Sequence, residues 1–130
     1  MAYEDRILDL TFPADEDLSN DQYRIMVLTS TGTVRRPDAA TDIPIGVLQN
    51  APAVAGQAAV VRMIGSGGVS KIQLGATLAT GVTVACEYVG AADAGKGIAP
   101  IATTYPVGIL LQGGAEDDLG TVLLGNVTVV

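Results

Sequence analysis

Two groups of carboxylates are the side chains of this sequence that could most directly do chemistry. The first lies in DEDLSND, residues 15–21, and the second in EDD, residues 116–118. Paired carboxylates can hydrolyse glycosides or bind Ca²⁺. However, DEDLSND lacks the D-x-[DN]-x-[DN]-G pattern of a calcium loop, and no feature of the sequence places the two groups across a cleft. Because charge runs in loops usually face water, we predict solvated turns at Asp15, Glu16, Asp17, Asp21, Glu116, Asp117 and Asp118.

Two glycine-rich stretches, GSGG at 65–68 and GKG at 95–97, are candidates for phosphate binding. A P-loop ends in GK[ST] and leads into a helix, whereas GSGGVSKIQL runs into a segment typical of a strand. Lys71 does not restore the pattern. Glycine is the usual residue where the backbone needs a positive φ, so we predict that both stretches are turns.

The sequence contains no histidine, which removes Ser–His and Cys–His nucleophile pairs and histidine metal sites. The single cysteine, Cys86, stands in the alternating run VTVACEYV and is predicted to be a small core residue. Few polar groups remain that could converge in a pocket. We therefore predict a protein that is not an enzyme and that has no cofactor and no metal.

Charge and composition limit the kinds of partner that the protein is expected to bind. The 130 residues carry a formal net charge of −7, and Arg35 and Arg36 are the only adjacent basic residues. Nucleic-acid binding needs clustered Lys and Arg, so no nucleic-acid partner is expected. No apolar run is long enough for a membrane span, and the N-terminus does not resemble a signal peptide, which predicts a cytoplasmic origin. Only one Phe and no Trp are available for a core, so we expect self-association.

Many short β-like runs alternate with Gly- and Pro-containing turns, and no helical stripe of useful length occurs. This pattern predicts an all-β fold, a small single-domain β-barrel or sandwich. Residues 1–22 are predicted to form an extended N-terminal arm and an acidic loop, and residues 23–130 the β domain. The expected strands lie in YRIMVLTS, TGTV, PIGVLQ, AAVVRMIG, VSKIQL, VTVACEYV, GIAPI, PVGILLQ, TVLLG and NVTVV.

One phrase occurs twice. PIGVLQ begins at Pro44 and PVGILL at Pro106, and each is followed by a turn, a glycine and an apolar run. The two half-chains therefore appear as copies of one β-rich unit, and we predict a pseudo-symmetric body. Gly46 and Gly108 are expected to permit close packing or a bulge at equivalent strands.

The two ends of the chain are candidates for contacts with other subunits. ILDLTF at 7–12 alternates as a strand does and could add to the sheet edge of a partner, or pair within its own domain. The last residues, NVTVV, form a bare apolar strand that would be sticky if exposed. We predict that Val127, Val129 and Val130 are covered within the fold or by a neighbouring subunit.

The order of these phrases resembles that of phage capsid decoration (cement) proteins of the DUF2190 type. The similarity covers about residues 8–130 and lies in the order and spacing of the phrases, since each one is mostly Gly, Pro and Val. Family members often have charged residues in the last strand region, where this chain has NVTVV. The matching phrases are Leu28–Val34, Pro44–Asn50, Gly56–Ile64, Gly75–Val82 and Pro106–Leu124.

The resemblance implies a structural virion protein, made in the host cytoplasm and carried on the outer surface of the mature phage head. Its partners would be the major capsid protein and itself, as a homo-oligomer and commonly a trimer, with no membrane involved. Binding only to the mature lattice would stabilise that lattice by mass action. An extended N-terminal arm docks on the shell in similar proteins, which makes Ile7, Leu8, Leu10 and Phe12 the candidate capsid-docking residues.

Two other kinds of function remain open. A head-fibre base or a tail-associated structural protein would also be rich in β-strands and oligomeric, and its position on the virion would separate it from a cement protein. A small-molecule-binding β domain would instead show a deep pocket lined by converging polar groups.

Overall fold

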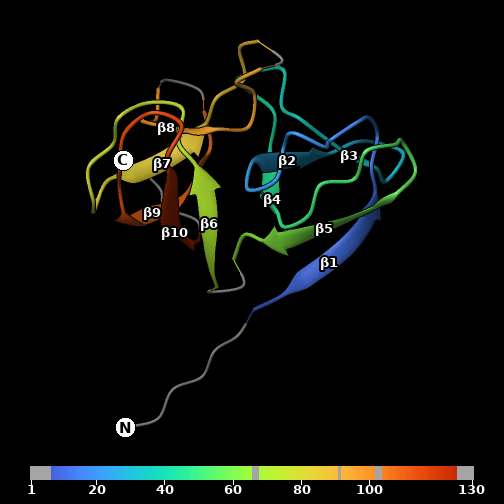
Figure 1. Cartoon of the computed structure of the whole chain (residues 1–130), viewed down its shortest axis with the longest axis horizontal. Helices are drawn as coiled ribbons and strands as arrows, with labels where there is room; N and C mark the ends of the chain where they lie inside the picture. Colours follow the sequence, from blue (N-terminus) through green and yellow to red (C-terminus); the bar gives the residue numbers. More distant parts are fainter. Residues whose placement is uncertain (1–6, 66–67, 91, 102–103, 126–130) are drawn as a thin grey trace, which may run out of the picture.

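A computed structural model of the chain describes residues 7–65, 68–90, 92–101 and 104–125 (Figure 1). The all-β prediction is confirmed: the described residues form ten strands and no helix. Residues 75–81, GATLATG, hold no helical turn, and Leu78 forms an isolated bridge with Gly114. The strands are β1 (Asp9–Pro13), β2 (Ile25–Leu28), β3 (Val34–Arg35), β4 (Pro44–Leu48), β5 (Ala58–Met63), β6 (Val69–Gln73), β7 (Thr83–Cys86), β8 (Gly97–Ile98), β9 (Pro106–Gln112) and β10 (Leu119–Leu124).

The strands form two antiparallel five-stranded sheets with one topology. The first half of the chain gives the order β1-β5-β4-β2-β3, and the second half gives β6-β10-β9-β7-β8. An isolated parallel bridge joins the two edges of each sheet, between Ala14 and Val34 in the first half and between Leu74 and Gly97 in the second. Each sheet is therefore curled into a partly closed barrel, and the two barrels lie beside each other (Figure 1).

The predicted repeat extends to the register of the strands. In the first half, Gly46 faces Met26 on β2 and Met63 on β5. In the second half, Gly108 faces Val84 on β7 and Leu124 on β10. A register shift follows Met26 in one half and Val84 in the other, so even the irregularity is repeated. The two half-chains are thus copies of one unit at the level of single residue pairs.

Each half builds its own core from inward-facing apolar residues. One cluster belongs to the first half and the other mainly to the second. The second cluster also contains Ile25 and Val47, which come from the first half and are fully buried. The outer face of the first sheet is therefore buried against the second half. The first-half cluster comprises Ala14, Leu18, Met26, Val34, Leu48, Ala59 and Val61.

Hydrogen bonds also join the halves. Ile25 N donates to Gly95 O at 2.7 Å, and Gln73 N donates to Tyr23 O at 2.9 Å. Arg24 Nε donates to Gln73 Oε1 at 3.0 Å. Gly95 has φ +90°, and a Cβ there would press against Ile25 O, so this junction requires glycine. The halves meet through β6 and the Gly95 turn on one side and β2 and β4 on the other.

Candidate functional site

The most deeply buried ionic group of the described chain is an aspartate that belongs to the first carboxylate group. Asp21 has no exposed surface, which corrects the prediction that it lies in a solvated turn. Its two oxygens contact Arg24 Nη1 and Arg36 Nη1, each at 3.1 Å. Arg36 also reaches Glu16 at 3.2 Å. Buried charges must be paired: Arg24 stands three residues after Asp21, whereas Arg36 returns to it from 15 residues away, which the sequence did not show.

Burial and interactions with neighbouring groups have opposite effects on the pKa values of Asp21 and Asp42. Burial raises the pKa of Asp21, and the guanidinium groups of Arg36 and Arg24 act against the rise. In the neighbouring loop, burial also acts on Asp42, but hydrogen bonds from Asp38 N, Arg35 and Ala39 N lower the pKa of this carboxyl group. Both carboxylates therefore hold the loops of the first half in place.

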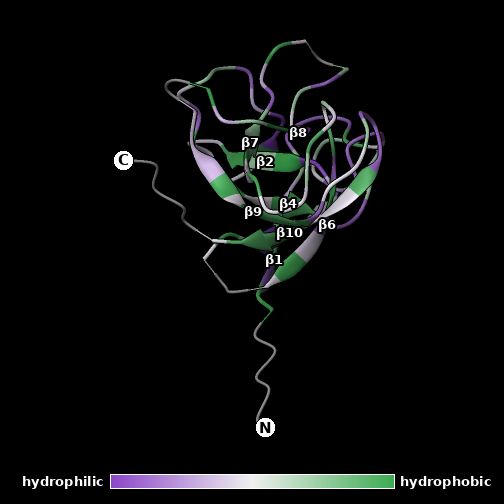
Figure 2. Cartoon of the chain, turned by 90° about the vertical axis from the view of Figure 1, so that its left-hand side faces the viewer, coloured by the Kyte–Doolittle hydropathy of each residue, from purple (hydrophilic) through white to green (hydrophobic). Residues whose placement is uncertain are grey.

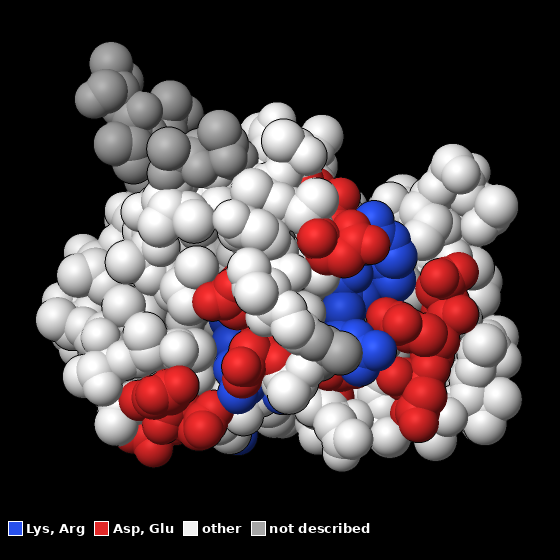
Figure 3. Space-filling view, turned by 90° about the horizontal axis from the view of Figure 1, so that it is seen from above, with Lys and Arg blue, Asp and Glu red and all other residues white. Residues whose placement is uncertain are grey.

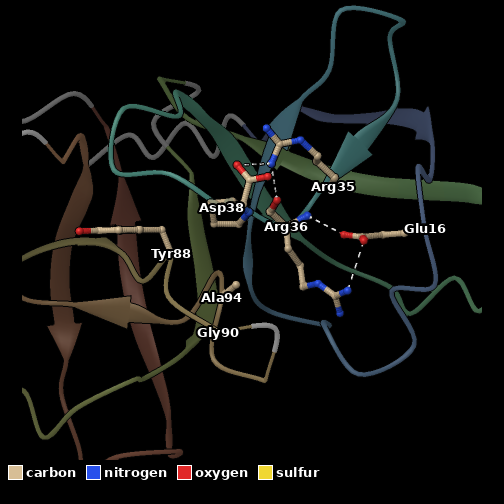
Figure 4. A pocket seen from close by; sticks show the side chains of 8 residues that line it. Glu16, Arg35, Arg36, Asp38, Tyr88, Gly90 and Ala94 are labelled. Atoms are coloured by element: carbon tan, nitrogen blue, oxygen red, sulfur yellow. Dashed lines mark hydrogen bonds and ion pairs between the residues drawn. The ribbon is translucent and has the colours of Figure 1, made fainter.

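A pocket of about 340 Å³ lies between the two halves next to this cluster (Figure 4). Arg35 and Arg36 line one side, and Tyr88 lies across from them with its hydroxyl directed away from the guanidinium groups. Arg35 contacts Asp38 at 3.2 Å and Asp42 at 3.3 Å. Because both guanidinium groups already have carboxylate partners, the pocket offers no unpaired cation to an anionic ligand.

The second carboxylate group also serves a structural ion pair. Asp117 Oδ1 lies 2.6 Å from Lys96 Nζ, and Asp93 Oδ1 lies 2.7 Å from the same nitrogen. The hydrogen bonds that Lys96 donates to Asp117 and Asp93 raise the pKa of Lys96, and the bond from Lys96 lowers the pKa of Asp93. In the GKG stretch, Gly95 and Gly97 pack closely against other strands, as expected of a structural turn. Seen from above, basic side chains lie between acidic ones (Figure 3).

A second pocket, of about 390 Å³, opens where β5, β6 and β10 approach one another. Arg62 lines it and is held by Asp9, with Nε to Oδ1 at 2.9 Å, and by the carbonyl of Val69 at 2.9 Å. The ammonium group of Lys71 lies 5.6 Å from the centre of the Tyr23 ring, a cation–π contact. These contacts join the halves and leave no converging set of reactive groups.

The remaining candidates from the sequence have structural positions. Cys86 is 4% exposed and belongs to the core cluster, as predicted, and burial raises the pKa of its thiol to about 11. Gly65 has φ +85° with open space around it, while Ser66 and Gly67 lie outside the described residues. Within the described residues no group of three His, Cys, Asp or Glu side chains could hold a metal ion, and no helix could cross a membrane.

The predicted capsid-docking residues lie at or just before an edge strand. β1 pairs with β5, so Asp9–Pro13 adopts the alternative of pairing within its own domain. Ile7, Leu8 and Leu10 are exposed, and Leu8 O accepts a hydrogen bond from Met63 N at 2.9 Å. Phe12 is half-buried against the first-half core. Val127, Val129 and Val130 lie outside the described residues.

Comparisons with known proteins give no relative. No protein-family model, no curated protein and no solved structure matches the chain.

Proposed function

We propose that this chain is a non-enzymatic structural protein of a phage virion that binds the outside of the mature head and stabilises the lattice of the major capsid protein. The phrase order of the sequence supports the assignment, and the duplicated all-β body supports it as a scaffold. The proposal places the docking contact at Ile7 and Leu8, directly before β1, which lies at the edge of the first sheet (Figure 1).

The observation that carries the proposal is the exposed apolar surface of Ile7 and Leu8. Ile7 and Leu8 expose about half of their side-chain area directly before edge strand β1. In the described chain β1 pairs as a strand with β5, and Ile7 and Leu8 stand directly before it, so their exposed side chains can contact another chain. Phe12 is better described as part of the protein's own core, which leaves Ile7 and Leu8 as the main docking residues.

The charges of the described residues favour a protein partner over a polyanion. Five of the six described Lys and Arg side chains form ion pairs, and the sixth, Lys71, lies over Tyr23. Few cations are therefore available for phosphate groups. The paired residues are Arg24, Arg35, Arg36, Arg62 and Lys96.

Co-sedimentation tests the proposal. The purified protein is mixed with mature, undecorated heads of its phage and, separately, with unexpanded procapsids. We expect saturable binding to the mature heads alone. Absence of binding to both particles would refute the cement function, and binding to isolated tails in the same assay would replace it with a tail-associated role.

A double variant tests the docking residues. Ile7→Asp with Leu8→Asp keeps the backbone bond from Met63 N to Leu8 O but removes the apolar surface, so binding to heads is expected to fall at least tenfold. Val89→Asp is the control, because Val89 is an exposed apolar residue in the second half of the chain. Equal loss in both variants would argue against a specific contact at residues 7–8.

A further inference from the structure

The outer faces of the two sheets are equivalent in register but not in environment. In the first half, Val47 pairs with Ile25 on one side and with Arg62 on the other. In the second half, Ile109 pairs with Thr83 and with Leu123 in the same way. Ile25 and Val47 are fully buried because the second half of the chain covers them. No part of the described chain covers the equivalent face of the second half.

That uncovered face is apolar. Ile109, Leu111 and Leu123 are 36%, 47% and 38% exposed, and Val69, which pairs with Leu123, is 40% exposed. Figure 2 shows the second half from this side, with β9 and β10 mainly in the hydrophobic colour. Contiguous apolar patches of this kind mark interaction sites on soluble proteins.

The contact inside the chain indicates what fits such a face. Ile25 and Val47 of the first-half face pack into the core of the second half. The free edge of β6 adds hydrogen bonds to this contact, since Gln73 N donates to Tyr23 O and Val69 O accepts from Arg62. The strand equivalent to β6 is β1, since each pairs in the same register with β5 or β10. The corresponding edge of β1 has no strand beside it in the described chain. Within the described chain, the β9–β10 face and the β1 edge therefore have no partner. They are equivalent to the two surfaces that meet where the halves of the chain join.

The contact inside the chain and the proposed contact between copies have different side chains at equivalent positions. Inside the chain, Gln49 Nε2 donates to Ser70 Oγ at 2.9 Å, and Ser70 is 2% exposed. Leu111 is equivalent to Gln49, and Leu10 is equivalent to Ser70. Leu10 is 41% exposed. A polar pair within the chain thus corresponds to an apolar pair across the proposed contact.

A second pair of equivalent positions also differs between the two faces, being charged on one and apolar on the other. Arg62 and Asp9 form an ion pair on the first-half face, with Nε to Oδ1 at 2.9 Å. Leu123 and Val69 occupy the equivalent positions on the second-half face. The first-half face thus has an ion pair at the two positions where the second-half face has Leu123 and Val69.

We propose that the β9–β10 face of one copy binds the free β1 edge of a second copy, in a repeat of the contact that joins the two halves of each chain. Such a heterologous contact, with different surfaces on the two partners, generates a closed ring when the rotation between copies closes. Figure 1 shows β6 and β10 of the second half running across the direction of β5 in the first, so a rotation relates the two halves. The contact between copies uses the edge of β1, and it leaves Ile7 and Leu8, which precede the strand, for the proposed capsid contact.

One bond of the internal contact is not repeated. Pro13 stands where Gln73 stands in the second half and has no N–H to donate. The contact between copies is therefore mainly apolar, and it should be more sensitive to an introduced charge than to salt.

Light scattering after size exclusion tests the contact in the full chain. The wild type is expected at a small multiple of 13.2 kDa, with three copies expected from the resemblance. Leu123→Arg and, independently, Ile109→Arg should each give the monomer mass with an unchanged circular dichroism spectrum. Val89→Arg is the control, because Val89 is exposed outside this face, and it should remain oligomeric. A monomeric wild type, or a folded Leu123→Arg that is still oligomeric, would overturn the proposal.

Mixing two variants tests the head-to-tail arrangement. Leu10→Arg removes the edge and Leu123→Arg removes the face, so each is expected to be monomeric alone while keeping one intact surface. Mixed in equal amounts, they should form a one-to-one dimer and nothing larger. An isologous interface, in which both copies use the same patch, would give no dimer on mixing and would refute the heterologous contact.

Discussion

Gly46 and Gly108 lie at the same place in the two halves, and each faces a main-chain carbonyl of the neighbouring strand. A Cβ on Gly46 would overlap Arg62 O, and a Cβ on Gly108 would overlap Leu123 O. Arg62 and Leu123 are themselves equivalent in the repeat. The repeated phrase therefore preserves a backbone contact that leaves no room for a side chain.

We expect Gly46→Ala and Gly108→Ala to destabilise the protein, each by about 2 kcal/mol or more, because overpacking against backbone cannot be relieved by a side-chain rotation. Urea unfolding followed by circular dichroism measures the change. Gly125→Ala is the control, since a Cβ at Gly125 would meet nothing within 4 Å. A change below about 0.5 kcal/mol in both strand variants would show that the sheets can move apart at this point.

Asp21→Asn should lower the free energy of unfolding by about 3 kcal/mol, because it leaves Arg24 buried and deprives Arg36 of one partner. Asp17→Asn is the matched control in the same acidic run: Asp17 is exposed and accepts one bond, from Ser19 N. Denaturant titrations of the two variants give the comparison. If both substitutions had the same small effect, the buried cluster would not be a stabilising element.

The Lys96 ion pairs should give the protein a defined pH dependence. The pKa of Asp93 is lowered by its bond from Lys96, so this contribution is present above the unfolded pKa of about 3.9 and is lost as pH falls through the lower folded value. The pKa of Lys96 is raised, so its contribution is complete below about 10.4 and is lost at still higher pH.

Lys96→Met measures this dependence. The difference in unfolding free energy between wild type and variant should be largest near neutral pH, decrease in strong acid and decrease again in strong alkali. Lys71→Met, which removes a cation without a carboxylate partner, should show no such profile. A flat difference between wild type and Lys96→Met would contradict the assigned role.

Cys86 should be inert to thiol reagents in the folded protein at pH 8, because its side chain is buried and the pKa of the thiol is raised from 9.0 to about 11. A raised folded pKa contributes stability below pH 9 that is lost between about pH 9 and 11. Absorbance after addition of an aromatic disulfide reports the reaction, with protein in concentrated urea as the reactive reference. Rapid modification of the folded protein would place Cys86 outside the core.

The local sequence pattern predicted most of the strands. Alternation, β-branched residues and glycine turns located β2 to β10, because a half-buried strand requires those features wherever it lies in space. Two bounds differ from the expected runs: β3 ends one residue after TGTV, and β10 begins two residues before TVLLG. The repeated PIGVLQ and PVGILL phrases became β4 and β9 with the same register. The alternation of ILDLTF predicted β1 but left its partner open, since pairing with β5 depends on residues about 50 positions away.

The candidate sites were less accessible to the sequence. Asp21 stands in a polar run that gives every sign of facing water, and its burial follows only from Arg24 and Arg36 reaching it in three dimensions. The face made by Ile109, Leu123 and Val69 has a similar origin, since the three residues are on different strands. Arg24, three residues after Asp21, was a local signal for an ion pair, but the contact with Arg36 and the apolar face depend on residues far apart in the sequence.

By itself, then, the sequence determined the strand-forming segments, their duplication and the absence of histidine chemistry, because these depend on residue type and short-range periodicity. The tertiary structure alone decided that equivalent faces have different environments: Val47 is buried by the second half, whereas Ile109 is left exposed. The physical reason is that two copies of a unit joined in one chain share one contact, so one face and one edge of the pair have no partner among the described residues.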